Sequence, residues 1–323
     1  AESNKNELID IKDNVKKSEI PLLEVKNLTT RFLIKSGIGT SKGQVHAVEG
    51  IDFSLQQGET FGLVGESGCG KSTTGRSILR LVEPHRGKIL FEGQDLTTLN
   101  RNELRPFRRQ MQMIFQDPFA SLNPRMMVGE TIAEPMVVHG IIEKSEASEK
   151  SIEILKKVGL TSDYATRYPH ELSGGQRQRI GIARALALEP KLIIADEAVS
   201  ALDVSIQAQV VNLMMELQEE FGLSYLFISH DMAVIERVCH RVAVMYLGEI
   251  VELGTRGQVF ENPQHPYTKK LMKAVPVADP NLRKKELNLM TDEIPSLVKP
   301  IGYEPKKINL IQVEDGHFIK PFN

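Results

Sequence analysis

The sequence is poor in cysteine, has no long apolar run and shows no excess of one charge. Cys69 and Cys239 are the only cysteines in 323 residues, which is too few for a disulfide framework or a four-cysteine metal site, so a reducing compartment is expected. No apolar run approaches the ~18–20 residues that span a bilayer, and the charged start of the chain is unlike a signal peptide. With 40 Lys and Arg against 42 Asp and Glu, the basic excess of a nucleic-acid-binding protein is missing. The composition predicts a soluble intracellular globular protein.

Strand patterns and helix patterns alternate along most of the chain, and this alternation predicts a parallel α/β sheet. Short apolar or alternating runs predict strands at residues 22–34, 45–65, 87–93, 191–196, 223–230 and, in two short pieces, 240–254. Helical spacing marks residues 73–83, 176–187, 205–221 and 231–239, with Gly222 as a helix stop. Residues 117–171 are richer in helix formers, which predicts a helical insertion.

A glycine-rich loop between a strand pattern and a helix pattern is the strongest chemical motif. Residues 65–72 read GESGCGKS and fit G-x-x-x-x-G-K-[ST]. Glycines let backbone N–H groups turn toward phosphate oxygens, Lys71 can reach the β- and γ-phosphates, and the Ser72 hydroxyl can ligate Mg²⁺. The alternative is a glycine-rich turn with a chance Lys-Ser pair. The nucleotide-binding residues predicted here are Gly65, Glu66, Ser67, Gly68, Cys69, Gly70, Lys71, Ser72 and Thr73. Cys69 is interpreted as a small filler, with a redox role as the alternative.

An aliphatic strand pattern that ends in two acids, LIIADE at residues 192–197, supplies the second half of such a site. Asp196 would hold Mg²⁺, mainly through water, and Glu197 would polarise the attacking water. Buried strands that end in an acid are common, so this run is informative only beside the glycine-rich loop. Together the two motifs predict a site for ATP and Mg²⁺.

A third motif, LSGGQ at residues 172–176, indicates the family. Ser173, Gly174, Gly175 and Gln176 offer a hydroxyl and backbone N–H groups at the start of a helix pattern, where anions bind. With the three motifs in this order, the chain resembles the nucleotide-binding subunit of an ATP-binding-cassette (ABC) transporter. The resemblance implies that this segment meets the γ-phosphate of an ATP held by an opposing cassette. It also implies a P-loop NTPase fold with a mixed central sheet, an N-terminal antiparallel β subdomain and a helical subdomain insertion.

Four further residues match positions of this family. Gln116 in MIFQDP matches the glutamine that contacts Mg²⁺ and the lytic water, and His230 in FISHD matches the histidine that contacts the γ-phosphate. Asp203 in SALD matches the aspartate that reaches across the dimer. Phe32 aligns with the aromatic residue that stacks on adenine, with a phenylalanine of the strand core as the alternative. An isolated histidine is more often a buried structural residue, so the order of the motifs carries the interpretation of His230.

The family pattern also predicts how the chain is divided. An ABC ATPase domain is expected over residues 20–270, with 117–171 as its helical subdomain. A peptide-importer-type extension is expected over 271–323, where Pro and Lys are frequent. Residues 1–19 are interpreted as a flexible tail or linker, with a short amphipathic helix as the alternative.

Three segments narrow the resemblance to one branch of the family. Residues 115–135, 196–213 and 259–276 resemble the ATPases of bacterial dipeptide, oligopeptide and glutathione importers, and residues 262–267 and the end of the chain are most similar to the second cassette of fused glutathione-importer ATPases. The partners so implied are a second ABC cassette (identical, paralogous or fused), two membrane permease subunits and a periplasmic or extracellular substrate-binding protein. The implied location is peripheral, on the cytoplasmic face of the inner membrane. Some relatives carry a C-terminal cysteine cluster with an iron–sulfur centre; since no cysteine follows Cys239, that centre is not expected.

The competing interpretations are soluble ABC-type ATPases and inactive cassettes. ATPases of DNA repair or chromosome organisation separate their nucleotide motifs by long coiled coils, and no long heptad run lies between Lys71 and Ser173. Translation-linked ABC proteins normally join two cassettes by a basic linker. The presence of Lys71, Asp196, Glu197 and His230 argues against a catalytically dead cassette.

Overall fold

The computed structural model describes residues 18–35, 41–117, 121–274 and 296–322. The strands are β1 (Leu23–Lys35), β2 (Ser41–Leu55), β3 (Thr60–Val64), β4 (Arg86–Phe91), β5 (Gln94–Asp95), β6 (Met111–Ile114), β7 (Leu192–Asp196), β8 (Ser224–Ser229), β9 (Arg241–Tyr246), β10 (Glu249–Thr255), β11 (Val298–Lys299), β12 (Ile311–Glu314) and β13 (His317–Ile319). The α-helices are α1 (Lys71–Ile78), α2 (Arg101–Gln110), α4 (Val128–Val138), α5 (Ala147–Lys157), α6 (Gly174–Leu186), α7 (Val204–Phe221), α8 (Met232–Val238), α9 (Arg256–Glu261) and α10 (Pro266–Ala274).

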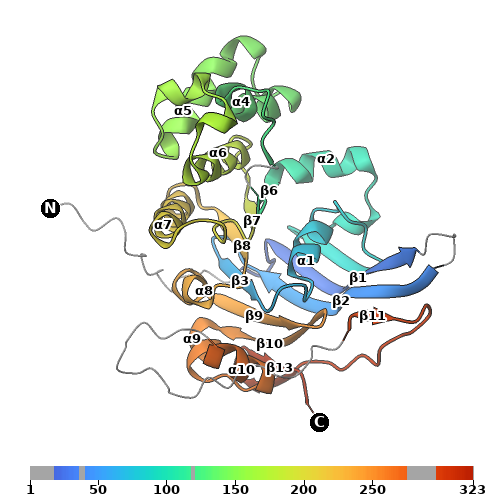
Figure 1. The fold of residues 1–323 in the computed structure, drawn as a ribbon. Helices are drawn as coiled ribbons and strands as arrows, with labels where there is room; N and C mark the ends of the chain where they lie inside the picture. The colour runs from blue at the N-terminus through green and yellow to red at the C-terminus, as the bar shows by residue number, and fades with distance from the viewer. Residues whose placement is uncertain (1–17, 36–40, 118–120, 275–295, 323) are drawn as a thin grey trace, which may run out of the picture.

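Two sheets organise these elements (Figure 1). The central sheet has the strand order β12-β13-β10-β9-β3-β8-β7-β6, and the second sheet has the order β11-β2-β1-β4-β5. From β6 to β9 the central strands are parallel, whereas β9 and β10 pair antiparallel. The second sheet is antiparallel throughout. A mixed central sheet and an N-terminal antiparallel subdomain are therefore both present, as predicted.

The central strands are buried on both faces, which explains their unbroken apolar sequences. In β8, Tyr225 and Phe227 belong to the core beneath helices α4–α8, whereas Leu226 and Ile228 belong to the core shared with α1 and the antiparallel sheet. The alternation follows from the period of two in a strand. One face of the central sheet therefore packs against a helical layer, and the other face packs against the layer that contains α1.

Helix α1 lies between the two sheets. A Cβ on its Gly75 would be 3.0 Å from the side chains of Ile194 in β7 and Ile228 in β8, so the helix packs closely on the central sheet. On its other side, the Ser77 hydroxyl hydrogen-bonds the Thr30 hydroxyl of β1 at 2.9 Å. The start of α1 is thereby fixed relative to both sheets.

The helical subdomain forms one end of the molecule. Figure 1 shows α4 and α5 together at the end farthest from α9, α10 and β13. Both helices lie within the predicted insertion at residues 117–171, and they pack on each other and on α6. Among the described helices, none has the length and the apolar character required to span a bilayer.

Most predicted elements are confirmed, although no strand or helix was predicted where β5, β6, α9, α10, β11, β12 and β13 lie. The helix after the glycine-rich loop runs from Lys71 to Ile78 rather than over 73–83, because the chain turns at Arg80, where φ is 50°. Helix α2 was not predicted at all. Half of its ten residues are charged and Leu104 is its only buried residue, so it lacks the apolar periodicity that marks a helix. A capping box from Asn100 and Glu103 starts it instead.

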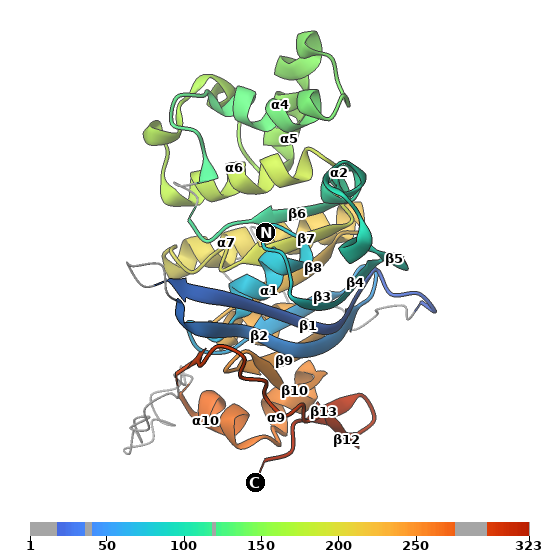
Figure 2. The ribbon, with the colours of Figure 1, turned by 90° about the vertical axis from the view of Figure 1, so that its right-hand side faces the viewer.

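The C-terminal region, which comprises α9, α10 and β11–β13, adds β12 and β13 to the central sheet and β11 to the second sheet. β13 pairs antiparallel with β10 through Glu252–Ile319 and Leu253–Phe318, and β11 pairs with β2 through Val298–Val45. Figure 2 shows β12 and β13 at the end of the molecule opposite α4 and α5. Residues 1–17 of the predicted tail and 275–295 of the predicted extension lie outside the described residues, and α10 runs across the predicted boundary at residue 270.

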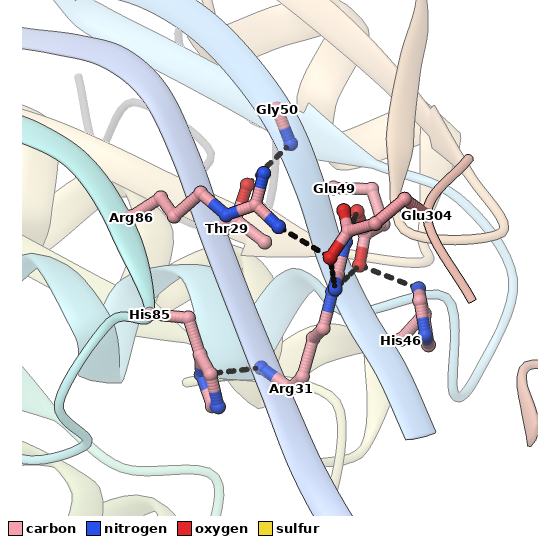
Figure 3. A network of polar contacts seen from close by, with 8 residues as sticks. All are labelled: Thr29, Arg31, His46, Glu49, Gly50, His85, Arg86 and Glu304. Carbon is pink, nitrogen blue, oxygen red and sulfur yellow. Dashed lines mark hydrogen bonds and ion pairs between the residues drawn. The ribbon is translucent and has the colours of Figure 1, made fainter. Parts of the chain in front are cut away.

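A network of charges fastens this region to the antiparallel sheet (Figure 3). Both Nη atoms of Arg31 in β1 donate to the Glu304 carboxylate, at 2.8 and 2.9 Å, and Arg86 of β4 donates to the same group. Arg31 also donates to Glu49 of β2 at 2.6 and 2.9 Å. Hydrogen bonds from the two arginines lower the pKa of Glu304 to about 2.

We expect the variant Glu304→Gln to loosen the attachment of residues 296–310. The lowered pKa means that the pairing stabilises the folded chain above the ordinary glutamate pKa of 4.5, and that this stabilisation is lost as the pH falls toward about 2. At pH 7 the variant should show a lower Tm and faster hydrogen exchange in residues 296–310, and the Tm difference should shrink below pH 4.5. Glu314→Gln, an exposed glutamate in β12, serves as the control. Equal exchange in all three proteins would contradict the expectation.

Candidate functional site

The predicted catalytic residues meet at one edge of the central sheet. Strands β3, β8, β7 and β6 are parallel neighbours, so the loops that follow them leave the sheet at the same edge. Gly65, His230 and Glu197 directly follow β3, β8 and β7, and Gln116 is the second residue after β6. Residues that are far apart in sequence are thereby brought into one site.

The glycine-rich loop turns from β3 directly into α1. Gly65 has φ 148° and Gly70 has φ 107°, both in the region that disfavours side chains. A Cβ would lie 2.2 Å from the Met245 carbonyl oxygen at Gly65 and 2.0 Å from the Ala47 carbonyl oxygen at Gly70. Only glycine fits these positions, and the loop leads the backbone to the N-terminus of α1, where an anion is favoured.

Lys71 lies folded into this loop. Its side chain is buried, and its Nζ donates to the carbonyl oxygens of Gly65 and Glu66, each at 2.8 Å. A buried ammonium costs free energy unless it is hydrogen-bonded, and the two carbonyls meet that need. The lysine therefore stands beside the loop's backbone, close to where a bound phosphate would sit.

Asp196 at the end of β7 joins the two nucleotide motifs. The Ser72 hydroxyl donates to Asp196 Oδ1 at 2.6 Å, which brings the predicted magnesium ligands together. Asp196 is 1% exposed, its Oδ2 has no hydrogen-bond partner, and Arg76 Nη2 lies 3.9 Å from that oxygen. Burial raises the pKa of Asp196. A buried carboxylate oxygen without a partner is a site that a cation would satisfy.

Glu197 lies between two polar side chains from neighbouring strands. Gln116 Nε2 donates to Glu197 Oε2 at 2.7 Å, and His230 Nδ1 lies 3.4 Å from Glu197 Oε1. The Glu197 backbone has φ 47°, which is unusual for a residue with a side chain and is typical of functional positions. All three predicted catalytic residues are thus in one cluster next to Asp196.

Cys69 is buried within the glycine-rich loop. Burial is the main cause that raises the pKa of its thiol, so the reactive thiolate is disfavoured. Its Sγ lies against the loop, where a Cβ on Gly65 would be 2.9 Å from it. The structure therefore supports the interpretation of Cys69 as a filler.

The LSGGQ segment lies apart from this cluster. Ser173 is the N-cap of α6: its Oγ accepts from the Gln176 N–H at 3.3 Å, and Gln176 Oε1 accepts from the Ser173 N–H at 3.0 Å. Between described residues, no hydrogen bond or ion pair joins 173–176 to the loop at 65–73. Asp203 is exposed just before α7, and its side chain makes no capping hydrogen bond. Among the described residues, neither 173–176 nor Asp203 makes a hydrogen bond or an ion pair with Gln116, Glu197 or His230.

Phe32 lies on β1, on the antiparallel sheet, opposite Val45 of β2. Its side chain is 40% exposed. The alternative interpretation as a residue of the strand core is therefore wrong. An exposed ring leaves a face free for a flat apolar group.

Two contacts of the site were not predicted from the sequence. Arg76 in α1 lies near Asp196, and the Tyr267 hydroxyl of α10 accepts a hydrogen bond from the Glu66 N–H at 3.2 Å. Arg76 follows the glycine-rich loop by one helical turn, and this spacing could have predicted that it lies near the site. Tyr267 belongs to a segment that sequence similarity marked, but nothing in the sequence places it against the loop.

Two family models match the chain. The model described as "ABC transporter" matches residues 48–200, and the model described as "Oligopeptide/dipeptide transporter, C-terminal region" matches residues 251–302. The first covers the glycine-rich loop, LSGGQ and both acids. The second covers Tyr267 and the start of the attached C-terminal region.

The chain is similar to curated proteins named glutathione import ATP-binding protein GsiA. It is 58% identical to that of Pectobacterium atrosepticum over 315 residues, which is 96% of this chain and 51% of the relative. Against that of Escherichia coli (strain K12) it is 56% identical over 300 residues, which is 93% of this chain and 48% of the relative. The chain thus spans about half the length of the curated relatives it matches.

Solved structures agree with the fold. The chain is similar to cbiO1 from Clostridium perfringens, described as part of an ABC transporter complex, with a TM-score of 0.64, 27% identity and coverage of 76% of this chain and 92% of that one. It is also similar to an ATP-binding cassette solved as a dimer with ADP and Pi, with a TM-score of 0.63, 29% identity and coverage of 72% and 98%. These similarities confirm the predicted ABC ATPase fold. The chain therefore belongs to the ABC transporter ATP-binding family, in the branch that carries the oligopeptide/dipeptide transporter C-terminal region.

Proposed function

We propose that this chain hydrolyses ATP to power the import of peptides or glutathione across a bacterial inner membrane. The observation that carries the proposal is the cluster at the ends of β6, β7 and β8, where Glu197 stands between Gln116 and His230. Phosphoryl transfer needs positioning and charge stabilisation more than covalent chemistry. This cluster can hold a water beside the phosphate-binding loop at residues 65–73, which is what hydrolysis requires.

Each side chain of the cluster has a task in this proposal. Lys71 and the loop N–H groups bind the β- and γ-phosphates, and Glu197 accepts the proton of the attacking water. Gln116 and His230 hold Glu197 and the water in line. Phe32 offers its exposed ring to adenine. The residues of these roles come from both sheets, so the site needs the whole cassette.

The residues around Asp196 fit a magnesium ion. Ser72 Oγ and both oxygens of Asp196 are hard oxygen donors, and Oδ2 has no partner. Among the described residues, no group of three or more His, Cys, Asp or Glu side chains forms a metal site of its own. Mg²⁺ is commonly bound through one or two carboxylates and completes its shell with water and phosphate oxygens. Ser72, Asp196 and Gln116 would hold the ion, which would neutralise charge on the phosphates.

The LSGGQ segment and Asp203 act on a second cassette in this proposal. Ser173 is exposed and caps the N-terminus of α6, which is a favourable place for the γ-phosphate of a nucleotide held by another chain. One similar cassette was solved as a dimer bound to ADP and Pi. We infer that two cassettes enclose each ATP between residues 65–73 of one and 173–176 of the other.

The names of the relatives support the proposal for the partners and the cargo. Proteins about twice as long are named for glutathione import, and the C-terminal model is named for oligopeptide and dipeptide transporters. The second cassette is identical, paralogous or fused. Two permease subunits and a periplasmic or extracellular substrate-binding protein complete the importer, and this chain lies peripherally on the cytoplasmic face of the membrane.

Asp196→Asn should make the nucleotide-free protein more stable at pH 7 and weaken binding of ATP with Mg²⁺. The raised pKa of Asp196 means that its ionised form costs folding free energy. The protonated carboxyl stabilises the fold below the ordinary pKa, and this stabilisation is lost as the pH rises through the raised pKa. The gain in Tm at pH 7 should therefore shrink in acid. Loss of the charged ligand should weaken Mg²⁺-dependent ATP binding by ~10-fold or more.

Differential scanning calorimetry at several pH values and ATP titrations with and without Mg²⁺ measure both effects. Asp315→Asn, an exposed aspartate, is the control. A lower Tm together with unchanged nucleotide affinity would contradict the assignment of Asp196.

Glu197→Gln should retain ATP and lose turnover. The glutamine can still accept from Gln116 through its carbonyl oxygen, but it cannot take a proton from water, so kcat should fall by ~10²-fold or more. Phosphate release and equilibrium ATP binding on the same sample separate the two quantities. Glu189→Gln carries the same change at an exposed residue near the opposite end of β7, and it should behave as wild type. Near-normal turnover of Glu197→Gln would remove Glu197 from the role of base.

Ser173→Arg should separate ATP binding from hydrolysis. The phosphate-binding loop and Asp196 are untouched, so the ATP affinity of one chain should stay within ~2-fold. Turnover should fall by ~10²-fold, the scale of losing a positioned transition-state contact. The control is Ser148→Arg, at an exposed residue of α5 in the helical subdomain. If binding and turnover fall together in Ser173→Arg alone, the site is not shared between two cassettes.

A further inference from the structure

Tyr267 connects the C-terminal region to the phosphate-binding loop. It is the second residue of α10, is 8% exposed, and its hydroxyl oxygen accepts a hydrogen bond from the Glu66 N–H at 3.2 Å. Its ring packs on Tyr246, the last residue of β9, with ring centroids 4.2 Å apart. The ring contact fixes where the hydroxyl lies, and an aromatic side chain with two rotatable bonds holds such a position at low entropic cost.

Both polar groups of the Glu66 backbone are hydrogen-bonded. Its N–H donates to Tyr267 and its carbonyl oxygen accepts from Lys71 Nζ at 2.8 Å. It follows Gly65, whose φ of 148° lies in a region that only glycine adopts readily. A loop that begins with so pliable a residue needs external contacts to keep one conformation. The Tyr267 hydroxyl is such a contact, and it comes from outside the loop.

Tyr267 is itself positioned by a buried carboxylate. Glu252 of β10 is fully buried; its Oε1 accepts from the Gln264 N–H at 2.8 Å and its Oε2 from the His265 N–H at 2.9 Å. His265 Nδ1 then accepts from the Tyr267 N–H at 3.2 Å. The same Glu252 Oε1 also lies 2.8 Å from Nε2 of the fully buried His317 in β13. One chain of hydrogen bonds thus runs from the last strand to the phosphate-binding loop.

We propose that Tyr267 is a positioning residue that sets the conformation of the phosphate-binding loop, and that the C-terminal region controls nucleotide affinity through it. The residue touches no phosphate and acts through the Glu66 peptide group. The proposal rests on the proposed function only in assigning ATP to the loop. The catalytic cluster stands on β6, β7 and β8, away from this contact, so the effect falls on binding of the polyphosphate and not on the chemical step.

Tyr267→Phe removes the hydroxyl and keeps the ring, so the fold and the contact with Tyr246 are retained. Loss of one hydrogen bond to a partly buried N–H should raise the Kd and KM for ATP by about 3- to 10-fold. The value of kcat at saturating ATP should stay within ~2-fold of wild type. In the nucleotide-free protein, amide exchange of peptides over residues 65–72 should be faster.

Tyr246→Phe is the matched control, because it removes a hydroxyl from the same pair of rings. Among the described residues, no hydrogen bond joins the Tyr246 hydroxyl to the loop. The full-length chain is used throughout, with Tm as a check on folding. Faster loop exchange and a raised KM in Tyr267→Phe alone would support the proposal. Wild-type KM and exchange in Tyr267→Phe, equal effects in both variants, or a lower Tm without a change in KM would overturn it.

The exchange experiment needs no nucleotide. If the wild-type chain bound no ATP, the proposed function would fail, whereas the contrast between the two variants in loop exchange would still decide whether Tyr267 positions the loop. The two proposals therefore fail in different measurements.

Discussion

The parallel pairing of β3, β8, β7 and β6 is the constraint on which the site depends. The strands are paired almost level at their ends: Val64 lies opposite Ser229, Asp196 opposite Ile228 and Ile114 opposite Ala195. Because parallel strands end at one edge, every loop that follows them starts within one strand spacing of its neighbour. In this register the end of β7 lies close enough to α1 for the hydrogen bond from Ser72 to Asp196.

The site is built at a cost to folding stability. Asp196 is buried with one oxygen that has no hydrogen-bond partner, and Glu197 has a backbone conformation that side chains disfavour. Asp196 is the last residue of β7, and Glu197 follows it. The apolar side chains of β7 are buried in cores on both faces of the sheet. The packing of β7 therefore keeps a buried carboxylate and a strained backbone in place beside the glycine-rich loop.

The C-terminal region is part of the cassette rather than a separate lobe. It lengthens both sheets through β13 and β11, pairs Glu304 with Arg31 next to Phe32, and reaches the phosphate-binding loop through Tyr267. These contacts lie at the two parts of the proposed nucleotide site, the adenine side and the phosphate side.

Much of the fold and the site could be predicted from the sequence, because short motifs and apolar periodicity indicate both. The glycine-rich loop, LIIADE and LSGGQ are short runs whose residue types suit phosphate, a divalent cation and a helix N-terminus. Apolar periodicity also predicted most strands and helices correctly. Helix α2 was missed because half of its residues are charged and it buries only Leu104.

Tertiary structure alone decided which distant residues meet. The sequence predicted that Gln116, Glu197 and His230 act together only through a resemblance, and the register of the sheet supplies the distances. It gave no sign that Tyr267 contacts Glu66 or that Glu304 pairs with Arg31, because each pair joins segments about 200 residues or more apart. Such contacts leave no periodic pattern in a single sequence, since they depend on how whole elements pack and not on the neighbours of either residue.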